Sequence, residues 1–294
     1  MNPAARASLV LVAIAGLFFA TLSMLCYAST SASAQRSVWR ASSSLNVLAP
    51  RDGLPNFVFV GDSITELAVH PELNGFQNLF QGLYVRRADM INRGNGGWTS
   101  RQWLAALPTL LAERSAKPPL LTLLFLGAND ACFEGCSQFV PLDEYVSNLA
   151  TMVKAVRQTF NSRVLLVTPP PVDDKSKWNQ TRSNANTGKY AAAVVALGRS
   201  LQVPSVDLWT ALQPNISTIF FDGLHPNVVG NAALFNLMRA RIAEALPDLT
   251  PEALPVIYHF GDDPAYIDIT LDLLDQANFA ASMNLSQVAL SAQF

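Results

Sequence analysis

The chain has 294 residues, of which half are hydrophobic and 14% are charged. This composition supports a sizeable core and excludes global disorder, and the length suits one large α/β domain with appendages. The formal net charge is −2 and no long run of Lys or Arg occurs, so a nucleic acid is not an expected partner.

The first 34 residues have the pattern of a secretory signal peptide. Arg6 is followed by an uncharged apolar segment over residues 7–28, and small residues then end in Ala32-Ser33-Ala34. A basic start, an apolar run and an Ala-x-Ala site predict cleavage after Ala34 and a secreted protein. The apolar run is also long enough to span a bilayer, so the alternative is an uncleaved type II anchor in the secretory pathway. Both interpretations carry the body of the protein out of the cytosol.

Cysteines and glycosylation motifs agree with such a compartment. Cys132 and Cys136 form a C-x3-C pair, which we expect to be a disulfide closing a small loop under oxidising conditions. A metal site would need further ligands nearby, and none is evident, so we do not expect one there. Candidate N-glycosylation sites follow the N-x-S/T pattern at Asn179, Asn215 and Asn284.

Strand and helix patterns alternate about five times after residue 56. Apolar runs predict strands over 57–60, 87–92, 120–126, 163–168 and 203–208. Helical spacing and start signals predict helices over 72–84, from Thr99 or Ser100 onward, over 141–159, over 184–201 and over 228–245. This alternation implies right-handed crossovers and a parallel sheet between two helix layers. We therefore expect a three-layer α/β/α fold with a five-stranded parallel sheet in the flavodoxin-like order 2-1-3-4-5.

The predicted domain spans residues 35–247. A polar, Ser-rich lead-in over 37–52 is expected to pack on the domain as an extended arm. From residue 248 to 294 several prolines weaken the pattern, and 266–279 could form one more helix. This C-terminal extension could cover the site, bind a partner or pack on the domain, and we expect packing.

The stretch that organises the chain is residues 57–65, which read FVFVGDSIT. A buried-strand signal stops at Gly61 and a small hydroxyl residue, Ser63, follows two positions later. Ser63 then stands at the carboxyl edge of the sheet, where open α/β sheets bind ligands. This position makes Ser63 a candidate nucleophile. The alternative is that Asp62 and Ser63 form only a turn and a helix cap.

A nucleophilic serine needs a base, because its hydroxyl reacts weakly at neutral pH. The chain has three histidines, His70, His225 and His259. Of these, His225 has an acid three residues earlier, Asp222, within a Gly-containing turn. In such a turn the carboxylate can reach one imidazole nitrogen and leave the other facing the serine. The alternative for His225 is a loop histidine near a helix start.

A tetrahedral intermediate also needs hydrogen-bond donors for its oxyanion. The backbone N–H groups of Ser63 and of a glycine in the 92–97 loop could supply two, and the Asn129 side chain a third. Asn129 could instead belong to an Asn-Asp turn without substrate contact. Because these loops and the Asp222–His225 loop all leave the carboxyl ends of predicted strands, they are expected to meet at one sheet edge.

Four blocks at these strand ends carry a resemblance to a known family: GDSIT at 61–65, NRGNGGWTS at 92–100, GAND at 127–130 and DGLHP at 222–226. Together they resemble the blocks of the GDSL/SGNH hydrolase superfamily. The stretches RRADMINRG, VPLDEYVSNL, TPPPVD and VDLWTALQ are similar to its isoamyl acetate-hydrolysing esterase branch, and the resemblance covers about residues 57–247. The α/β-hydrolase elbow G-x-S-x-G does not fit, because Thr65 stands where that motif has glycine.

The resemblance implies a serine esterase with Ser63, His225 and Asp222 as the catalytic triad. It implies an oxyanion hole made by the N–H groups of Ser63 and Gly97 and by the Asn129 side chain. Trp98 then either lines the acyl or alcohol pocket or packs in the core. No cofactor and no metal are implied.

The expected substrates are small-molecule or glycan esters: short-chain acetate esters, acetylated polysaccharides or lysophospholipids. The signal segment favours an extracellular ester such as an acetylated glycan. The alternatives are an acyltransferase that uses the same acyl-enzyme and a catalytically silent secreted binding protein. We expect a monomer without nucleic-acid partners, which contacts a membrane only if the N-terminal segment is an uncleaved anchor.

Overall fold

The computed structural model describes residues 53–256. The signal segment, the lead-in arm over 37–52, His259, the possible helix over 266–279 and the Asn284 sequon lie outside the described residues. None of the helices within 53–256 is both long and apolar enough to cross a membrane.

A five-stranded sheet runs through the middle of the described domain, and all of its strand pairs are parallel. Its order is β2-β1-β3-β4-β5, as predicted. The strands are β1 (Asn56–Gly61), β2 (Asp89–Gly94), β3 (Leu121–Phe125), β4 (Arg163–Val167) and β5 (Ser205–Val206). In this register Gly61 lies opposite Gly94 on one side and Phe125 on the other. The loops that follow the three strands therefore start at the same level.

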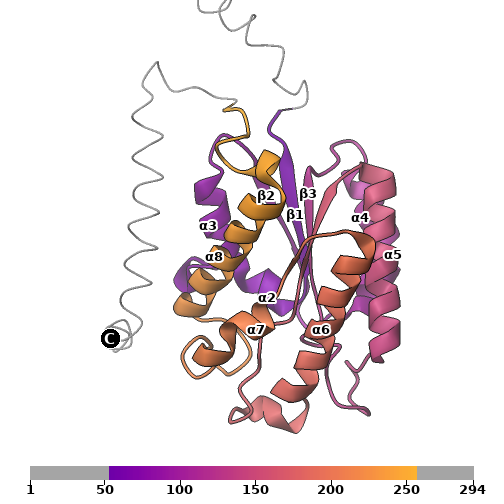
Figure 1. Ribbon diagram of the computed structural model, residues 1–294, viewed down its shortest axis with the longest axis vertical. Coiled ribbons are helices and arrows are strands. Elements are labelled where there is room, and N and C mark those ends of the chain that lie inside the picture. The colour runs from indigo at the N-terminus through magenta and orange to yellow at the C-terminus, as the bar shows by residue number, and fades with distance from the viewer. Residues whose placement is uncertain (1–52, 257–294) are drawn as a thin grey trace, which may run out of the picture. The chain divides into compact units, whose positions relative to one another are not determined.

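Helices cover both faces of the sheet, as Figure 1 shows. On one face lie α3 (Phe76–Leu83), α7 (Leu208–Leu212) and α8 (Val228–Ala245), and on the other lie α4 (Ser100–Arg114), α5 (Leu142–Phe160) and α6 (Asn184–Leu201). The short α2 (Ser63–Glu66) follows β1 directly. Five parallel strands between two helix layers are the predicted α/β/α architecture.

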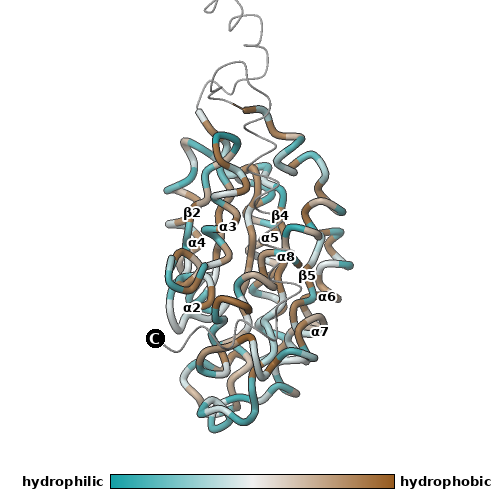
Figure 2. Tube along the Cα trace, turned by 90° about the vertical axis from the view of Figure 1, so that its left-hand side faces the viewer, coloured by the Kyte–Doolittle hydropathy of each residue, from teal (hydrophilic) through white to brown (hydrophobic). Residues whose placement is uncertain are grey.

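The central strands β1 and β3 are buried on both sides of the sheet, and their successive side chains alternate between the two faces. Phe57 and Phe59 of β1 join one apolar cluster, and Val58 and Val60 join the other. In the first cluster Phe80 of α3 contacts Phe235 of α8 edge to face, with ring centroids 4.9 Å apart. In Figure 2 brown segments run through the middle of the domain, and much of the hydrophilic teal lies on the outer turns.

Three elements differ from the sequence prediction. The helix predicted over 72–84 is broken, because Asn74 adopts a left-handed conformation (φ 45°) between a 3-10 turn and α3. The fifth strand is only two residues long. Pro204 precedes it without an N–H to donate, and Asp207 caps α7 immediately after it by accepting a hydrogen bond from the Thr210 backbone. Helix α7 was not expected from the sequence pattern.

The start of the predicted C-terminal extension packs on the domain. Leu249 and Leu254 are buried in the same apolar cluster as α8. The Tyr84 hydroxyl donates a hydrogen bond to the Leu249 carbonyl (2.8 Å), and Arg87 donates to the Leu254 carbonyl (2.6 Å). The core therefore extends beyond residue 247, where the sequence pattern weakens.

Candidate active site

Ser63 occupies the first position of α2, directly after β1. The Asp62 side chain caps this helix by accepting a hydrogen bond from the Ile64 backbone N–H (2.9 Å). The turn is tight at Gly61, where an added β-carbon would lie 2.0 Å from the Thr65 hydroxyl oxygen. The capping role considered for the Asp62-Ser63 pair thus belongs to Asp62, and the Ser63 hydroxyl is directed to another loop.

That loop carries His225 and Asp222. The Ser63 Oγ lies 2.9 Å from the His225 Nε2, and the His225 Nδ1 lies 2.9 Å from the Asp222 Oδ2. The other Asp222 oxygen accepts the backbone N–H groups of Leu224 (3.0 Å) and His225 (2.8 Å). The structure therefore brings hydroxyl, imidazole and carboxylate together in one continuous chain of hydrogen bonds.

The Asp222 carboxylate determines which imidazole nitrogen carries the proton. Burial acts to raise the pKa of Asp222, but the hydrogen bonds from the His225 backbone, the imidazole and the Leu224 backbone outweigh it, so that the pKa lies below its usual value. A carboxylate only accepts hydrogen bonds, and Nδ1 must donate to it. The Nε2 nitrogen is then the acceptor that faces the Ser63 hydroxyl.

The imidazole of His225 is flanked by two aromatic rings. Trp178 meets it edge to face at a centroid distance of 5.8 Å, and Phe221 lies nearly parallel to it at 5.7 Å. Phe221 is 54% exposed. Neither residue was singled out from the sequence.

His70, the other histidine within the described residues, lies in an exposed loop, where its Nδ1 pairs with Glu72 (2.7 Å).

The glycine loop after β2 lies against the start of α2. The Asn95 N–H donates to the Gly61 carbonyl (3.0 Å), and a β-carbon on Gly96 would lie 3.9 Å from the Ser63 Cβ. Gly97 adopts a φ of +76°, a backbone conformation that favours glycine. The Ser63 N–H stands at the first position of a helix, where no intrahelical acceptor is available. The two backbone groups expected to bind an oxyanion thus belong to adjoining segments.

Asn129 contacts the glycine loop at the residue after Gly97. Its side chain is 4% exposed, and its Nδ2 donates a hydrogen bond to the Trp98 carbonyl (2.9 Å). Trp98 itself packs on Trp103 at a ring distance of 5.2 Å and against the second apolar cluster. The observed contacts of Trp98 are therefore those of core packing, the second of its two predicted roles.

A model of the GDSL-like lipase/acylhydrolase family matches residues 59–233, which include Ser63, Gly97, Asn129, Asp222 and His225. The chain belongs to this family. Membership makes the protein an ester hydrolase of the GDSL/SGNH type and confirms the resemblance found in the sequence blocks.

Related proteins and solved structures agree with the assignment to the GDSL family. The chain is 33% identical to an isoamyl acetate-hydrolyzing esterase 1 homolog of Mus musculus over 76% of this chain and 97% of that protein. It is 32% identical to a GDSL esterase/lipase of Arabidopsis thaliana over 68% of this chain and 90% of that protein. The lipase/acylhydrolase from Enterococcus faecalis is 25% identical, with a TM-score of 0.56 over 70% of this chain and all of that one. The acetylxylan esterase Axe2 from Geobacillus stearothermophilus, 20% identical with a TM-score of 0.52 over 65% and 95%, shares the fold.

Two buried acids of this GDSL hydrolase, Asp62 and Asp130, lie near each other, and Asp62 directly precedes the candidate nucleophile Ser63. The pKa of Asp62 is raised to about 7: burial and, to a smaller extent, the nearby Asp130 raise it, whereas the Ile64 N–H and the Arg182 charge act to lower it. Burial likewise raises the pKa of Asp130 to about 6. One Asp130 oxygen accepts the Ser100 N–H (2.9 Å), and the other has no partner among the described residues. The sequence singled out Asp62 only as a possible cap.

The disulfide expected between Cys132 and Cys136 is wrong for this structure, in which both thiols are free. The Cys132 sulfur accepts a hydrogen bond from the Arg182 guanidinium (3.1 Å), whereas the Cys136 thiol faces the Thr181 carbonyl (3.7 Å). The Cys132 thiol also faces the Gln138 Oε1 (3.7 Å).

Of the predicted glycosylation sites, Asn179 is exposed on a short 3-10 turn and Asn215 is half-buried. Exposure of the side chain is a requirement for modification, and Asn179 meets it more fully.

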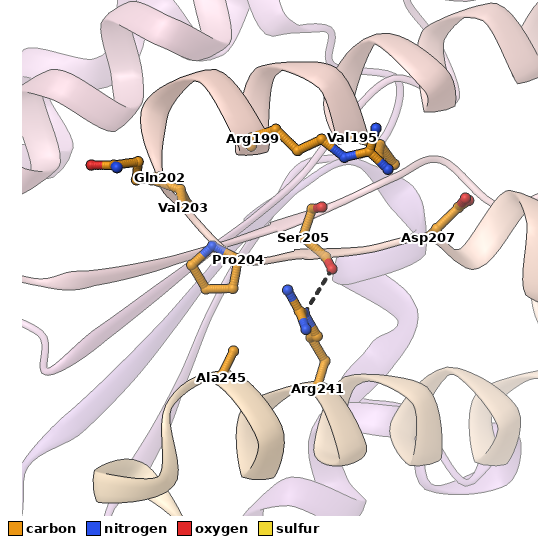
Figure 3. A pocket seen from close by; sticks show the side chains of 10 residues that line it. Val195, Arg199, Gln202, Val203, Pro204, Ser205, Asp207, Arg241 and Ala245 are labelled. Atoms are coloured by element: carbon orange, nitrogen blue, oxygen red, sulfur yellow. Dashed lines mark hydrogen bonds between the residues drawn. The ribbon is translucent and has the colours of Figure 1, made fainter.

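A cavity of about 550 Å³ lies elsewhere in the domain, between the end of α6, β5 and α8 (Figure 3). Its lining includes Arg199, Asp207 and Arg241, and Arg241 donates from Nε to the Ser205 carbonyl (3.1 Å). None of its lining residues belongs to the candidate triad or to the three candidate oxyanion donors, so this cavity is separate from the candidate active site.

Proposed function

We propose that this GDSL hydrolase is a serine esterase that cleaves short-chain carboxylic esters, acetyl esters above all, through a Ser63–His225–Asp222 triad and an acyl-enzyme. The observation that carries the proposal is the pair of 2.9 Å hydrogen bonds that joins the Ser63 hydroxyl to the imidazole and the imidazole to the Asp222 carboxylate. This arrangement activates a weak nucleophile by general-base catalysis.

In the first half-reaction, Ser63 Oγ attacks the ester carbonyl carbon while His225 Nε2 takes its proton. Asp222 holds the imidazole in the required tautomer and stabilises its protonated form. When the tetrahedral intermediate collapses, the bond between the carbonyl carbon and the alcohol oxygen breaks, and His225 gives its proton to the leaving alcohol. Water repeats the sequence on the acyl-enzyme, releases the carboxylic acid and restores the Ser63 hydroxyl.

The oxyanion of each tetrahedral intermediate is held by the N–H groups of Ser63 and Gly97 and by the Asn129 amide. The placement of the glycine loop against α2 and of Asn129 beside the Trp98 carbonyl supports these roles. Preorganised donors stabilise the charge that develops in the transition state, and each typically contributes a factor of about 10²–10³ to the rate.

The leaving alcohol is expected to contact the aromatic rings beside His225. Because the His225 Nε2 protonates this alcohol, the alcohol part of the ester lies next to the imidazole. Trp178 and Phe221 flank this imidazole. These apolar rings suit an alcohol with an apolar or ring-shaped face. The names of two similar proteins, an isoamyl acetate-hydrolyzing esterase homolog and an acetylxylan esterase, point to acetyl esters of an apolar alcohol and of a sugar.

The site of action is proposed to be extracellular, with the signal segment removed after Ala34 and the protein a monomer. The uncleaved anchor is the alternative. N-terminal sequencing of protein expressed in a secretory host and collected from the medium separates the two: a start at Gln35 supports cleavage, whereas intact protein in the membrane fraction contradicts it.

An ester panel tests the proposed chemistry. The wild-type protein is expected to hydrolyse p-nitrophenyl acetate, and Ser63→Ala to lose nearly all of this activity. Ser115→Ala, at an exposed helix end, serves as the matched control. Hydrolysis at the wild-type rate by Ser63→Ala would refute the mechanism. A wild type without activity on any ester would instead favour a binding protein, and acyl transfer to an added alcohol in preference to water would identify an acyltransferase.

A further inference from the structure

The oxyanion loop is held from outside by a side chain that the proposed mechanism does not use. Gln138, in the loop between β3 and α5, donates from Nε2 to the Gly97 carbonyl (2.9 Å). Its other amide atom, Oε1, accepts a hydrogen bond from the Arg182 Nη2 (3.0 Å). Arg182 lies in the loop between β4 and α6. The loops that follow β2, β3 and β4 are thus joined by two hydrogen bonds.

Arg182 decides which way the Gln138 amide faces. A guanidinium only donates hydrogen bonds, so the atom of Gln138 that faces it must be the carbonyl oxygen. The NH₂ group then faces the Gly97 carbonyl, where it can donate. If the amide were rotated by 180°, its oxygen would face the Gly97 carbonyl oxygen, and its NH₂ group would face the N–H groups of Arg182.

The Arg182 side chain is built into the protein rather than exposed on its surface. It is 2% exposed, and its Nε and Nη1 have no hydrogen-bond partner among the described residues. Its charge lies over the Trp178 ring at 4.9 Å, and the same ring contacts His225. A buried, incompletely paired cation is costly, so its position beside the active site calls for a role there.

Gly97 needs such support, because it has no side chain of its own to fix it. The turn around it is closed by a hydrogen bond from the Trp98 N–H to the Asn95 carbonyl (3.1 Å). Beyond that bond, two side-chain amides hold consecutive carbonyls: Gln138 holds that of Gly97 and Asn129 holds that of Trp98. Glycine backbones are permissive, so loss of one anchor would let the Gly97 N–H move.

We propose that Gln138 and Arg182 are positioning residues of the oxyanion hole, with Arg182 orienting the Gln138 amide and Gln138 holding Gly97. The inference rests on the proposed esterase function. Neither residue contacts the reacting atoms, so both act through the backbone of Gly97. A small displacement of a catalytic group can lower the rate by as much as about 10²-fold.

The decisive variant is Gln138→Glu. A glutamate keeps the acceptor for Arg182 and adds an ion pair, but it places an oxygen without a proton against the Gly97 carbonyl. We expect kcat on p-nitrophenyl acetate to fall about 10- to 100-fold with KM nearly unchanged, because the transition state depends on the oxyanion hole more than the bound ester does. Gln158→Glu, the same change at an exposed position of α5, should leave both constants unchanged.

Variants of Arg182 test whether this residue orients the Gln138 amide. Arg182→Met removes the guanidinium that donates to the Gln138 oxygen, so the Gln138 amide can rotate and kcat should fall. Arg182→Lys retains a donor and should recover part of the loss. Thermal denaturation is measured on every variant. A merely structural role would lower the melting temperature and leave the kcat of the folded fraction intact.

The two proposals fail in different ways. If the wild type hydrolyses esters through Ser63 but Gln138→Glu and Arg182→Met retain the wild-type kcat, the positioning role is overturned and the esterase assignment stands. If Ser63→Ala does not lower the activity, the proposed function itself fails. The positioning role is also overturned if Arg182→Lys and Arg182→Met lose the same amount of activity and this loss is explained by the smaller fraction of folded protein.

Discussion

The Ser63 hydroxyl oxygen lies 2.9 Å from the Nε2 of His225, although 162 residues separate them in the chain. Ser63 follows the central strand β1, and His225 lies in the loop before α8, so the fold alone brings them together. The hydrogen bond aligns the serine proton with the nitrogen that is proposed to remove it.

Replacing Asp222 with asparagine tests the tautomer argument. The amide retains similar size, but it can present an NH₂ group to Nδ1 and so favour the wrong imidazole tautomer. We expect kcat to fall by about 10⁴, as in serine hydrolases whose triad acid is replaced in this way. Steady-state hydrolysis of p-nitrophenyl acetate measures the loss, and activity within a factor of ten of wild type would show that Asp222 is dispensable.

Replacing Asn129 with alanine removes one proposed oxyanion donor. We expect a loss of about 10²–10³ in kcat with a small change in KM, because the donor acts on charge that develops in the transition state. Asn129 also holds the Trp98 carbonyl, so the melting temperature must be measured in parallel. An increase in KM at constant kcat would instead indicate a role in ground-state binding.

Asp62 is expected to make the stability of the protein depend on pH. Burial raises its pKa to about 7, above the value of about 3.9 in an unfolded chain. The folded protein then holds a proton that the unfolded chain has released, so this contribution to stability is full below pH 4 and is lost as the pH rises through 7.

The variant Asp62→Asn should therefore have a higher melting temperature than wild type at pH 8, with the difference shrinking toward pH 4. Asparagine retains an oxygen that can accept the Ile64 N–H. Thermal denaturation followed by circular dichroism between pH 4 and pH 8 measures the effect. A difference that is constant across this range would contradict titration of Asp62.

Phe221 is expected to affect substrate choice more than stability. It is 54% exposed, and its ring lies nearly parallel to the His225 imidazole. Phe221→Ala should change the free energy of unfolding by no more than about 0.5 kcal/mol, as exposed substitutions usually do. The value of kcat/KM should fall several-fold for acetates of ring-containing alcohols and little for methyl acetate. An equal loss on both esters would place Phe221 outside the alcohol site.

The sequence by itself determined the architecture and pointed to the candidate catalytic set. Alternating apolar runs and helical patterns predicted the sheet order, because each right-handed crossover constrains where the next strand can lie. Ser63 and Asn129 follow predicted strands directly, and His225 lies in the late DGLHP loop. These positions predicted that the three residues meet at one edge of the sheet. The spacing of Asp222 distinguished His225 from His70. Each of these patterns is local, so it can be recognised within one short stretch of the sequence.

Only the tertiary structure decided what surrounds that set. Gln138 meets Gly97 across 41 residues and Arg182 across 44, and Phe221 and Trp178 reach His225 from different loops. The free thiols of Cys132 and Cys136 and the two-residue β5 also depend on such neighbours. A hydrogen bond or ring contact depends on the positions of both partners, and no periodicity within either segment records where the other one lies.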